Sequence, residues 1–156
     1  MLEFDDVPPS RGSYMLHHYF SLSQLLVIGR LGSYCLPAGH YFYVGSARGG
    51  GGLRARVGRH LRGDGAQHWH IDYVRAVAEV REVFYTVTDR AIECKWSQAL
   101  ARLPHARIPV PYFGASDCRS GCRAHLIAFP RNVANNQLQP VLEHVARLPL
   151  ICLSVS

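Results

Sequence analysis

The segment from Tyr41 to His60, YFYVGSARGGGGLRARVGRH, concentrates residues that can bind phosphate. Its aromatic start, YFYV, has the alternation of a strand and is followed by four consecutive glycines. Beyond the glycines, Leu53, Arg56 and His60 recur at helical spacing, so they share one face of an expected helix. A strand end, a glycine turn and an arginine-bearing helix start together predict a place where phosphate is held.

Positive charge is focused on the same segment. The 156 residues carry a formal net charge of +6. Five arginines lie close together in the chain: Arg48, Arg54, Arg56, Arg59 and Arg62. Such a cluster predicts a polyanionic partner, with nucleic acid as the leading candidate. A charge run more often forms a solvated helix face, but the adjoining glycines and tyrosines favour binding here.

A second group of candidate residues is His68, His70 and Asp72, in the sequence HWHID. In an extended segment the three side chains would share a face and could bind a metal or a substrate. In a helix they would not, and the histidines would support the fold through hydrogen bonds to the backbone. The local sequence leaves both alternatives open.

A third group is Cys118, Cys122 and His125, with Cys94 as a conceivable fourth member. The spacing loosely resembles that of zinc ligands, but it lacks the paired C-x₂-C knuckle of many zinc sites. The pattern therefore favours buried thiols near a turn over a zinc site.

The elements that must position these groups are short strands and helices. Alternation or apolar runs predict strands at residues 12–20, 24–28, 41–44, 79–87 and 122–129, the last as the final strand. Helical spacing predicts three helices: residues 53–62, a helix that begins after a cap at Thr88 or Asp89, and residues 138–148. Glu93 lies at the edge of the apolar stripe of the second helix. The strands separated by Gly and Pro indicate an antiparallel meander.

Composition limits the class of protein. Apolar residues make up 48% of the chain and charged residues 18%, which is typical of a globular protein. We expect one domain over 1–156, with a core at 12–129 and a tail helix within 135–148. Neither a signal peptide nor a membrane span is apparent, and five cysteines without an export signal indicate reduced thiols. A cytoplasmic protein without a membrane partner is therefore expected.

Four motifs occur in an order that resembles the GIY-YIG nuclease superfamily. They are Gly12-Ser13-Tyr14, Tyr43-Val44-Gly45, Leu53-x-x-Arg56-x-x-x-His60, and Glu93 on a later helix. Further segments resemble the Uri-type endonuclease branch, also called domain of unknown function 123: YVGSA, RHLR, HWHIDY, Glu93-Cys94 and SDC…C..HL. The resemblance covers residues 12–129.

The resemblance implies an α/β (α+β) fold, with a small central antiparallel β-sheet flanked by helices. It also implies an endonuclease that hydrolyses DNA phosphodiester bonds with one divalent cation, Mg²⁺ or Mn²⁺. Glu93 would be the sole protein ligand of this cation, which suits a hard ion that keeps most of its waters.

Roles for other residues follow from the same resemblance. Arg56 would clamp the scissile phosphate and stabilise charge in the transition state. Tyr43 would be the general base, with Tyr14 orienting water beside it. The Tyr43 phenol has an ordinary pKa of about 10, which a neighbouring cation could lower. His60 would hydrogen-bond the tyrosine, the water or the phosphate. Contacts to nucleic acid would come from residues around this centre: Gly45, Ser46, Arg48, Arg54, Arg59, Arg62, His68 and His70.

Three departures from the family pattern leave other functions open. Ser13 replaces an apolar residue, Ser46 stands where many relatives have lysine or threonine, and the four glycines lengthen the turn. Arg48 could supply the missing cationic contact. One alternative is a nucleic-acid-binding module of the same fold with weak or no activity. Another is an RNA-directed nuclease, because nothing in these residues reads a 2′-hydroxyl.

Overall fold

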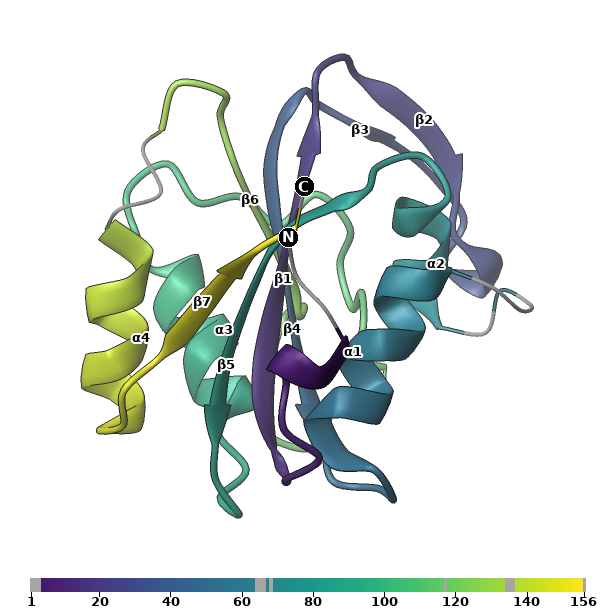
Figure 1. The fold of residues 1–156 in the computed structure, drawn as a ribbon. Coiled ribbons are helices and arrows are strands. Elements are labelled where there is room, and N and C mark those ends of the chain that lie inside the picture. The colour runs from purple at the N-terminus through teal and green to yellow at the C-terminus, as the bar shows by residue number, and fades with distance from the viewer. Residues whose placement is uncertain (1–3, 64–66, 68, 117, 134–136, 156) are drawn as a thin grey trace.

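A five-stranded antiparallel sheet forms the centre of the protein, with helices on both of its faces (Figure 1). The computed structural model describes residues 4–63, 67, 69–116, 118–133 and 137–155. The strand order is β6-β4-β1-β5-β7. The bounds are β1 Gly12–Phe20, β4 Gly39–Ala47, β5 Val80–Val87, β6 Leu126–Phe129 and β7 Ile151–Ser154. This mixed architecture confirms the expected fold class.

Two helices cover each face of the sheet. Helices α1 (Gly52–Arg62) and α2 (His70–Arg75) lie on one side, and α3 (Glu93–Ala101) and α4 (Leu138–Ala146) lie on the other (Figure 1). Short 3-10 turns form at η1 (Phe4–Asp6) and η2 (Gly29–Leu31). Strands β2 (Gln24–Val27) and β3 (Ser33–Leu36) make a separate two-stranded sheet. Of the residues described here, none belongs to a helix long and apolar enough to cross a membrane.

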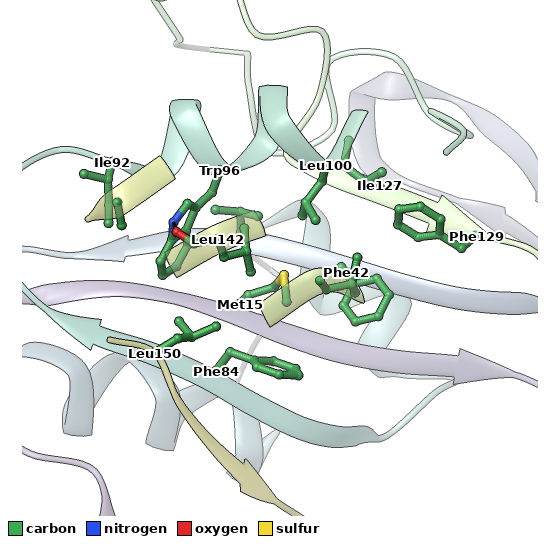
Figure 2. Close-up of a cluster of buried hydrophobic side chains, with 13 residues drawn as sticks. Met15, Phe42, Phe84, Ile92, Trp96, Leu100, Ile127, Phe129, Leu142 and Leu150 are labelled. Carbon is green, nitrogen blue, oxygen red and sulfur yellow. Dashed lines mark hydrogen bonds between the residues drawn. The ribbon is translucent and has the colours of Figure 1, made fainter. Parts of the chain in front are cut away.

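The central strands are covered on both faces, as the absence of a polar face in residues 12–20 predicted. On the α3 side, Met15, Phe42 and Trp96 pack in a cluster that α4 closes with Leu142 (Figure 2). The indole Nε1–H of Trp96 donates a hydrogen bond of 3.1 Å to the Leu142 carbonyl, which satisfies the only polar atom of that side chain. The sheet therefore lies between buried hydrophobic side chains on both of its faces.

Three details of the predicted order were wrong. The strands do not form a meander, because β1 pairs with β4 and β5 while the β2–β3 hairpin is separate. The final strand is β7, whose four mostly exposed residues show little alternation. Helix α3 starts at Glu93 without a side-chain cap, since the Thr88 hydroxyl instead accepts the Arg90 N–H in a turn, at 3.0 Å.

Candidate active site

A cleft of about 660 Å³ opens beside β4, and residues from several separate elements line it. Tyr43 comes from β4, Arg56 from α1 and Glu93 from the start of α3. Trp69 and His70 line it at the start of α2, and further lining comes from described residues between Gly114 and His125, which we call the wall segment. The three residues to which the sequence assigned metal binding, phosphate binding and base catalysis thus face one common cavity.

Glu93 is the first residue of α3, so its position depends on where that helix begins. Its Oε2 atom is buried and has no hydrogen-bond partner within the described part of the chain. A buried carboxylate oxygen without a partner is costly, and a cation or a hydrogen-bond donor in the cleft would offset that cost. The negative charge of Glu93 also reaches His125, where it partly offsets the lowering of the His125 pKa by burial.

Arg56 is held against an aromatic surface. Its guanidinium carbon lies 4.5 Å from the centre of the Trp69 ring, and that of Arg59 lies 3.9 Å from the same ring. Arg59 in turn makes two hydrogen bonds of 3.0 Å to the carboxylate of Asp72. Asp72 also accepts the backbone N–H of Trp69 at 2.8 Å. This linked set fixes the ring on which Arg56 rests.

Tyr14 and His60 form a buried pair outside the cleft lining. Their hydroxyl and Nε2 atoms are 2.9 Å apart, and both residues are about 1% exposed or less. Sheet register explains the placement, because Tyr14 is opposite Gly45 and Leu16 is opposite Tyr43 on adjacent strands. A Cβ atom on Gly45 would lie 2.4 Å from the Tyr14 ring and hydroxyl. Gly45 therefore makes room for a tyrosine, and its predicted nucleic-acid contact gains no support from this position.

Burial controls the acid–base properties of the site. It raises the pKa of Tyr43 to about 12, although Arg56 and Arg59 pull it down. Burial, with Tyr43 as a second cause, also raises the pKa of Tyr14 well above its usual value. It lowers the pKa of His60 to about 3, so this imidazole is neutral at physiological pH. As expected, the nearby arginines lower the pKa of the Tyr43 phenol, but burial raises it by more.

The glycine turn does not present a free helix N-terminus to phosphate, which corrects the first prediction. The N–H groups of Leu53 and Arg54 donate to the carbonyls of Ser10 and Pro8, at 2.8 and 3.0 Å. The N-terminal residues expected to be a mere lead-in thus cap α1. Gly52 has φ +56° and a Cβ there would lie 2.3 Å from the Ser10 carbonyl, so glycine is required for this approach.

Some of the arginines assigned to nucleic-acid binding have other contacts. Arg48 donates to the Asp89 carbonyl at 2.9 Å. Arg54 donates to the Val7 carbonyl at 2.9 Å and faces η1 rather than the cleft. Arg62 is exposed at the end of α1 and does not line the cleft. Their contacts with nucleic acid stay predictions.

The remaining assigned residues divide by position. Ser46 alternates with Tyr43 and Gly45 on β4, so its side chain points to the other face of the sheet. The alternatives for HWHID are decided by α2, which begins at His70 and turns Asp72 toward Arg59. His70 Nδ1 accepts a hydrogen bond of 2.8 Å from the Gly114 N–H and thereby joins α2 to the wall segment. His68 lies outside the described residues.

Sequence reasoning missed one feature of the cleft and gave little weight to another. Trp69 supports Arg56 and Arg59, and the only signal for it was an aromatic residue between two histidines. The structure also brings Cys94, Cys118, Cys122 and His125 together, with all four ligand atoms within 4.8 Å of one another. The sequence named these four residues as possible zinc ligands but favoured buried thiols near a turn, because the spacing lacks a paired C-x₂-C knuckle.

Comparisons with known proteins were made for the whole chain. A family model described as "Domain of unknown function DUF123" matches residues 13–147, which is most of the chain. Searches of curated proteins and of solved structures give no significant match.

Proposed function

The chain belongs to the DUF123 family, and from this premise we propose that it is a metal-dependent endonuclease of the GIY-YIG type, Uri branch, which hydrolyses DNA phosphodiester bonds. One observation carries the proposal: Tyr43, Arg56 and Glu93 come from three elements and line one cleft. Any of them alone would be an ordinary surface or sheet residue. Their convergence on one cavity supports a shared chemical task.

Glu93 fits the role of the single protein ligand for Mg²⁺ or Mn²⁺. Its buried Oε2 has no hydrogen-bond partner in the described residues, and a hard cation takes such an oxygen readily. Within this part of the chain no second carboxylate lines the cleft, which suits an ion that keeps waters and takes further oxygens from the substrate. When bound, the cation would stabilise negative charge on the phosphate.

Arg56 supplies the fixed positive charge of the site. A guanidinium can donate two parallel hydrogen bonds to phosphate oxygens and stabilise the charge that grows in the transition state. The Trp69 ring, 4.5 Å away, limits the motion of this side chain before substrate binds. Arg59 is already paired with Asp72, so Arg56 is the better candidate for direct phosphate contact.

Tyr43 is the proposed general base, and its environment sets a condition on that role. With its pKa raised to about 12, the side chain is a phenol at neutral pH and must lose its proton to accept one from water. The neighbouring Arg56 charge favours the phenolate. The Tyr14–His60 pair packs beside it, with ring centres of Tyr43 and His60 6.0 Å apart, and holds the ring in place.

A cleavage assay tests the function. Wild-type protein is incubated with single-stranded, duplex and branched DNA, and with RNA of matched sequence, in Mg²⁺ or Mn²⁺. We expect metal-dependent cleavage of DNA. Glu93→Ala and Arg56→Ala should each reduce the rate by about 10²–10³-fold. Matched controls are Glu79→Ala and Arg30→Ala, which remove the same charges from exposed positions outside the cleft lining.

The controls make the negative outcomes informative. Absence of cleavage by wild type, or equal rates for Glu93→Ala and Glu79→Ala, would refute the catalytic proposal. Binding to DNA with a steep salt dependence but no strand scission would select the binding-module alternative. Preferential cleavage of the matched RNA would select the RNA-directed nuclease.

A further inference from the structure

Three cysteines and one histidine meet beside the cleft, and Cys94, Cys118 and His125 are among the residues that line it. Cys94 lies in the first turn of α3, and the other three lie in the wall segment: Cys118, Cys122 and His125. Cys122 and His125 are buried, whereas Cys94 and Cys118 are half-buried. None of these four side chains has a role in the proposed cleavage chemistry.

The distances within this Cys₃His cluster fit a single metal ion. The Sγ atoms of Cys94 and Cys118 are 3.4 Å apart, and Cys94 Sγ lies 3.7 Å from Nε2 of His125. All four ligand atoms lie within 4.8 Å of one another. A tetrahedral ion with metal–sulfur bonds of about 2.3 Å would place two sulfurs about 3.8 Å apart, and a sulfur and a nitrogen slightly closer. The observed separations are close to these values.

We propose that Cys94, Cys118, Cys122 and His125 bind one zinc ion in a structural site. Three thiolates and an imidazole form a soft ligand set that suits zinc and disfavours Mg²⁺, whose ligands are oxygens. Four protein ligands complete a tetrahedron and leave no position for water or substrate. The site is thus distinct from the Glu93 site in both chemistry and purpose.

Neighbouring groups are arranged as they are around metal-bound thiolates. The Gln98 side chain, one turn further along α3 than Cys94, has its Nε2 3.8 Å from Cys122 Sγ and 3.4 Å from the Ser120 carbonyl. A donor to a ligand sulfur stabilises its negative charge and orients it. The hydrogen bond also ties the wall segment to the same helix that carries Cys94.

The wall segment is closed into a loop by backbone hydrogen bonds. Its two ends are joined by backbone hydrogen bonds, from Tyr112 N–H to the Arg123 carbonyl and from His125 N–H to the Phe113 carbonyl, both 2.7 Å. Within this loop, the described residues Cys118 and Cys122 both contact Cys94 of α3, and the Ser120 carbonyl accepts a hydrogen bond from Gln98. A zinc ion would add metal–ligand bonds to these contacts between the loop and the helix.

Zinc binding has a consequence for the cleft. Cys94 directly follows Glu93, so an ion on Cys94 fixes the first turn of α3. The same ion would fix the wall segment, which lines the cleft together with Arg56. The zinc site would keep both sides of the cavity at a constant separation, which is a positioning role and not a step of the reaction.

Metal analysis of the purified wild-type chain is the first test. After exhaustive dialysis, elemental mass spectrometry should find one zinc per chain. Exchange for Co²⁺ should produce the intense visible bands of tetrahedral cobalt together with thiolate-to-cobalt charge transfer in the near ultraviolet. Both measurements use the wild type, so they do not depend on whether a variant folds.

Variants locate the ion. Cys118→Ser and Cys122→Ser should weaken zinc affinity at least 100-fold in competition with a chromophoric chelator, while Cys118→His should retain zinc because imidazole is also a ligand. Gln98→Leu should weaken it about tenfold. The controls Cys35→Ser and Cys152→Ser alter exposed free cysteines outside the cluster and should leave affinity unchanged.

Several results would overturn the zinc proposal. The wild type could lack stoichiometric zinc, contain iron instead, or have Cys94 and Cys118 joined as a disulfide. Its cobalt form could also lack thiolate charge-transfer bands. Retention of zinc by Cys118→Ser and Cys122→Ser would also overturn it. Glu93→Ala separates the two proposals, because it should lose cleavage but keep its zinc. Stoichiometric zinc in a wild type that cleaves no DNA would put the nuclease proposal, not the zinc site, in error.

Discussion

The hydroxyl of Tyr14 and Nε2 of His60 lie 2.9 Å apart in a buried pair that joins β1 to α1. Without its partner, each residue would have a buried polar atom that lacks a hydrogen bond. The Nδ1 atom of His60 already has no partner in the described residues. The pair therefore contributes to stability as well as to the placement of Tyr43.

We expect Tyr14→Phe to lower the free energy of unfolding by about 1–3 kcal/mol, because it leaves the buried Nε2 of His60 unpaired. Urea unfolding followed by circular dichroism measures this change. The control Tyr112→Phe removes a hydroxyl from a side chain that is 62% exposed and should change stability by less than about 0.5 kcal/mol. Equal effects of both substitutions would show that the pair has no special weight.

Buried histidines should make the protein sensitive to acid. Burial lowers the pKa of His60 to about 3 and that of His18 to about 4, from an ordinary value of 6.5. The unfolded chain therefore binds protons below about pH 6.5 that the folded chain does not bind until its own lower pKa values are reached. Stability is fully present above pH 6.5 and falls as the pH is lowered toward 3–4.

Urea unfolding at several pH values measures this slope, to which each histidine adds up to about 1.4 kcal/mol per pH unit. His18→Gln removes one such group while its amide can still donate to the Ala78 carbonyl, the present partner of Nδ1. The slope of the variant should be smaller by the contribution of one proton. An unchanged slope would exclude His18 as a source of the acid sensitivity.

The close approach of Tyr14 to Gly45 predicts a strong effect of a single methyl group. In Gly45→Ala the new Cβ would lie 2.4 Å from the buried Tyr14 ring, which has no free space to enter. We expect a loss of about 1–3 kcal/mol of stability from overpacking. The control Gly50→Ala adds a methyl group where no heavy atom lies within 4 Å. Thermal or urea unfolding should leave that control close to wild type.

The Arg59–Asp72 pair should influence substrate binding through Trp69. Asp72→Asn removes the charge that Arg59 contacts and weakens the hold on the Trp69 backbone. We expect KM for DNA to rise by about tenfold with a smaller change in kcat, because Arg56 loses its fixed support. Asp5→Asn is the control, since Asp5 is 90% exposed and 3.8 Å from Arg54. A change confined to kcat would contradict this positioning role.

If Tyr43 is the base, the cleavage rate should rise with pH. Its pKa is raised to about 12, so each unit of pH between about 6 and 9 raises the phenolate fraction about tenfold. The measurement is kcat/KM across this range for the wild type and for Tyr43→Phe. The variant should be slower and should lose most of the pH dependence. The same slope in both proteins would assign the proton transfer to another group.

Local patterns in the sequence determined most of the elements that surround the site. Alternation without a polar face gave residues 12–20 as a doubly covered strand, and β1 has those bounds. The 3.6-residue period placed Arg56 and His60 on one helix, which is α1. These properties depend on side chains a few residues apart, so they can be read before any tertiary contact is known. Strand β7 escaped because its pairing with β5 is long-range and its own pattern is weak.

Only the tertiary structure decided which groups meet. The carbonyls of Pro8 and Ser10 accept the first N–H groups of α1, so a segment of the same chain lies where phosphate was expected. Tyr43, Arg56 and Glu93 share a cleft because β4, α1 and the start of α3 converge there, which no spacing encodes. The Cys₃His cluster likewise joins Cys94 to a segment 24–31 residues further on. The sequence supplies the chemical groups, and packing of distant elements determines their distances.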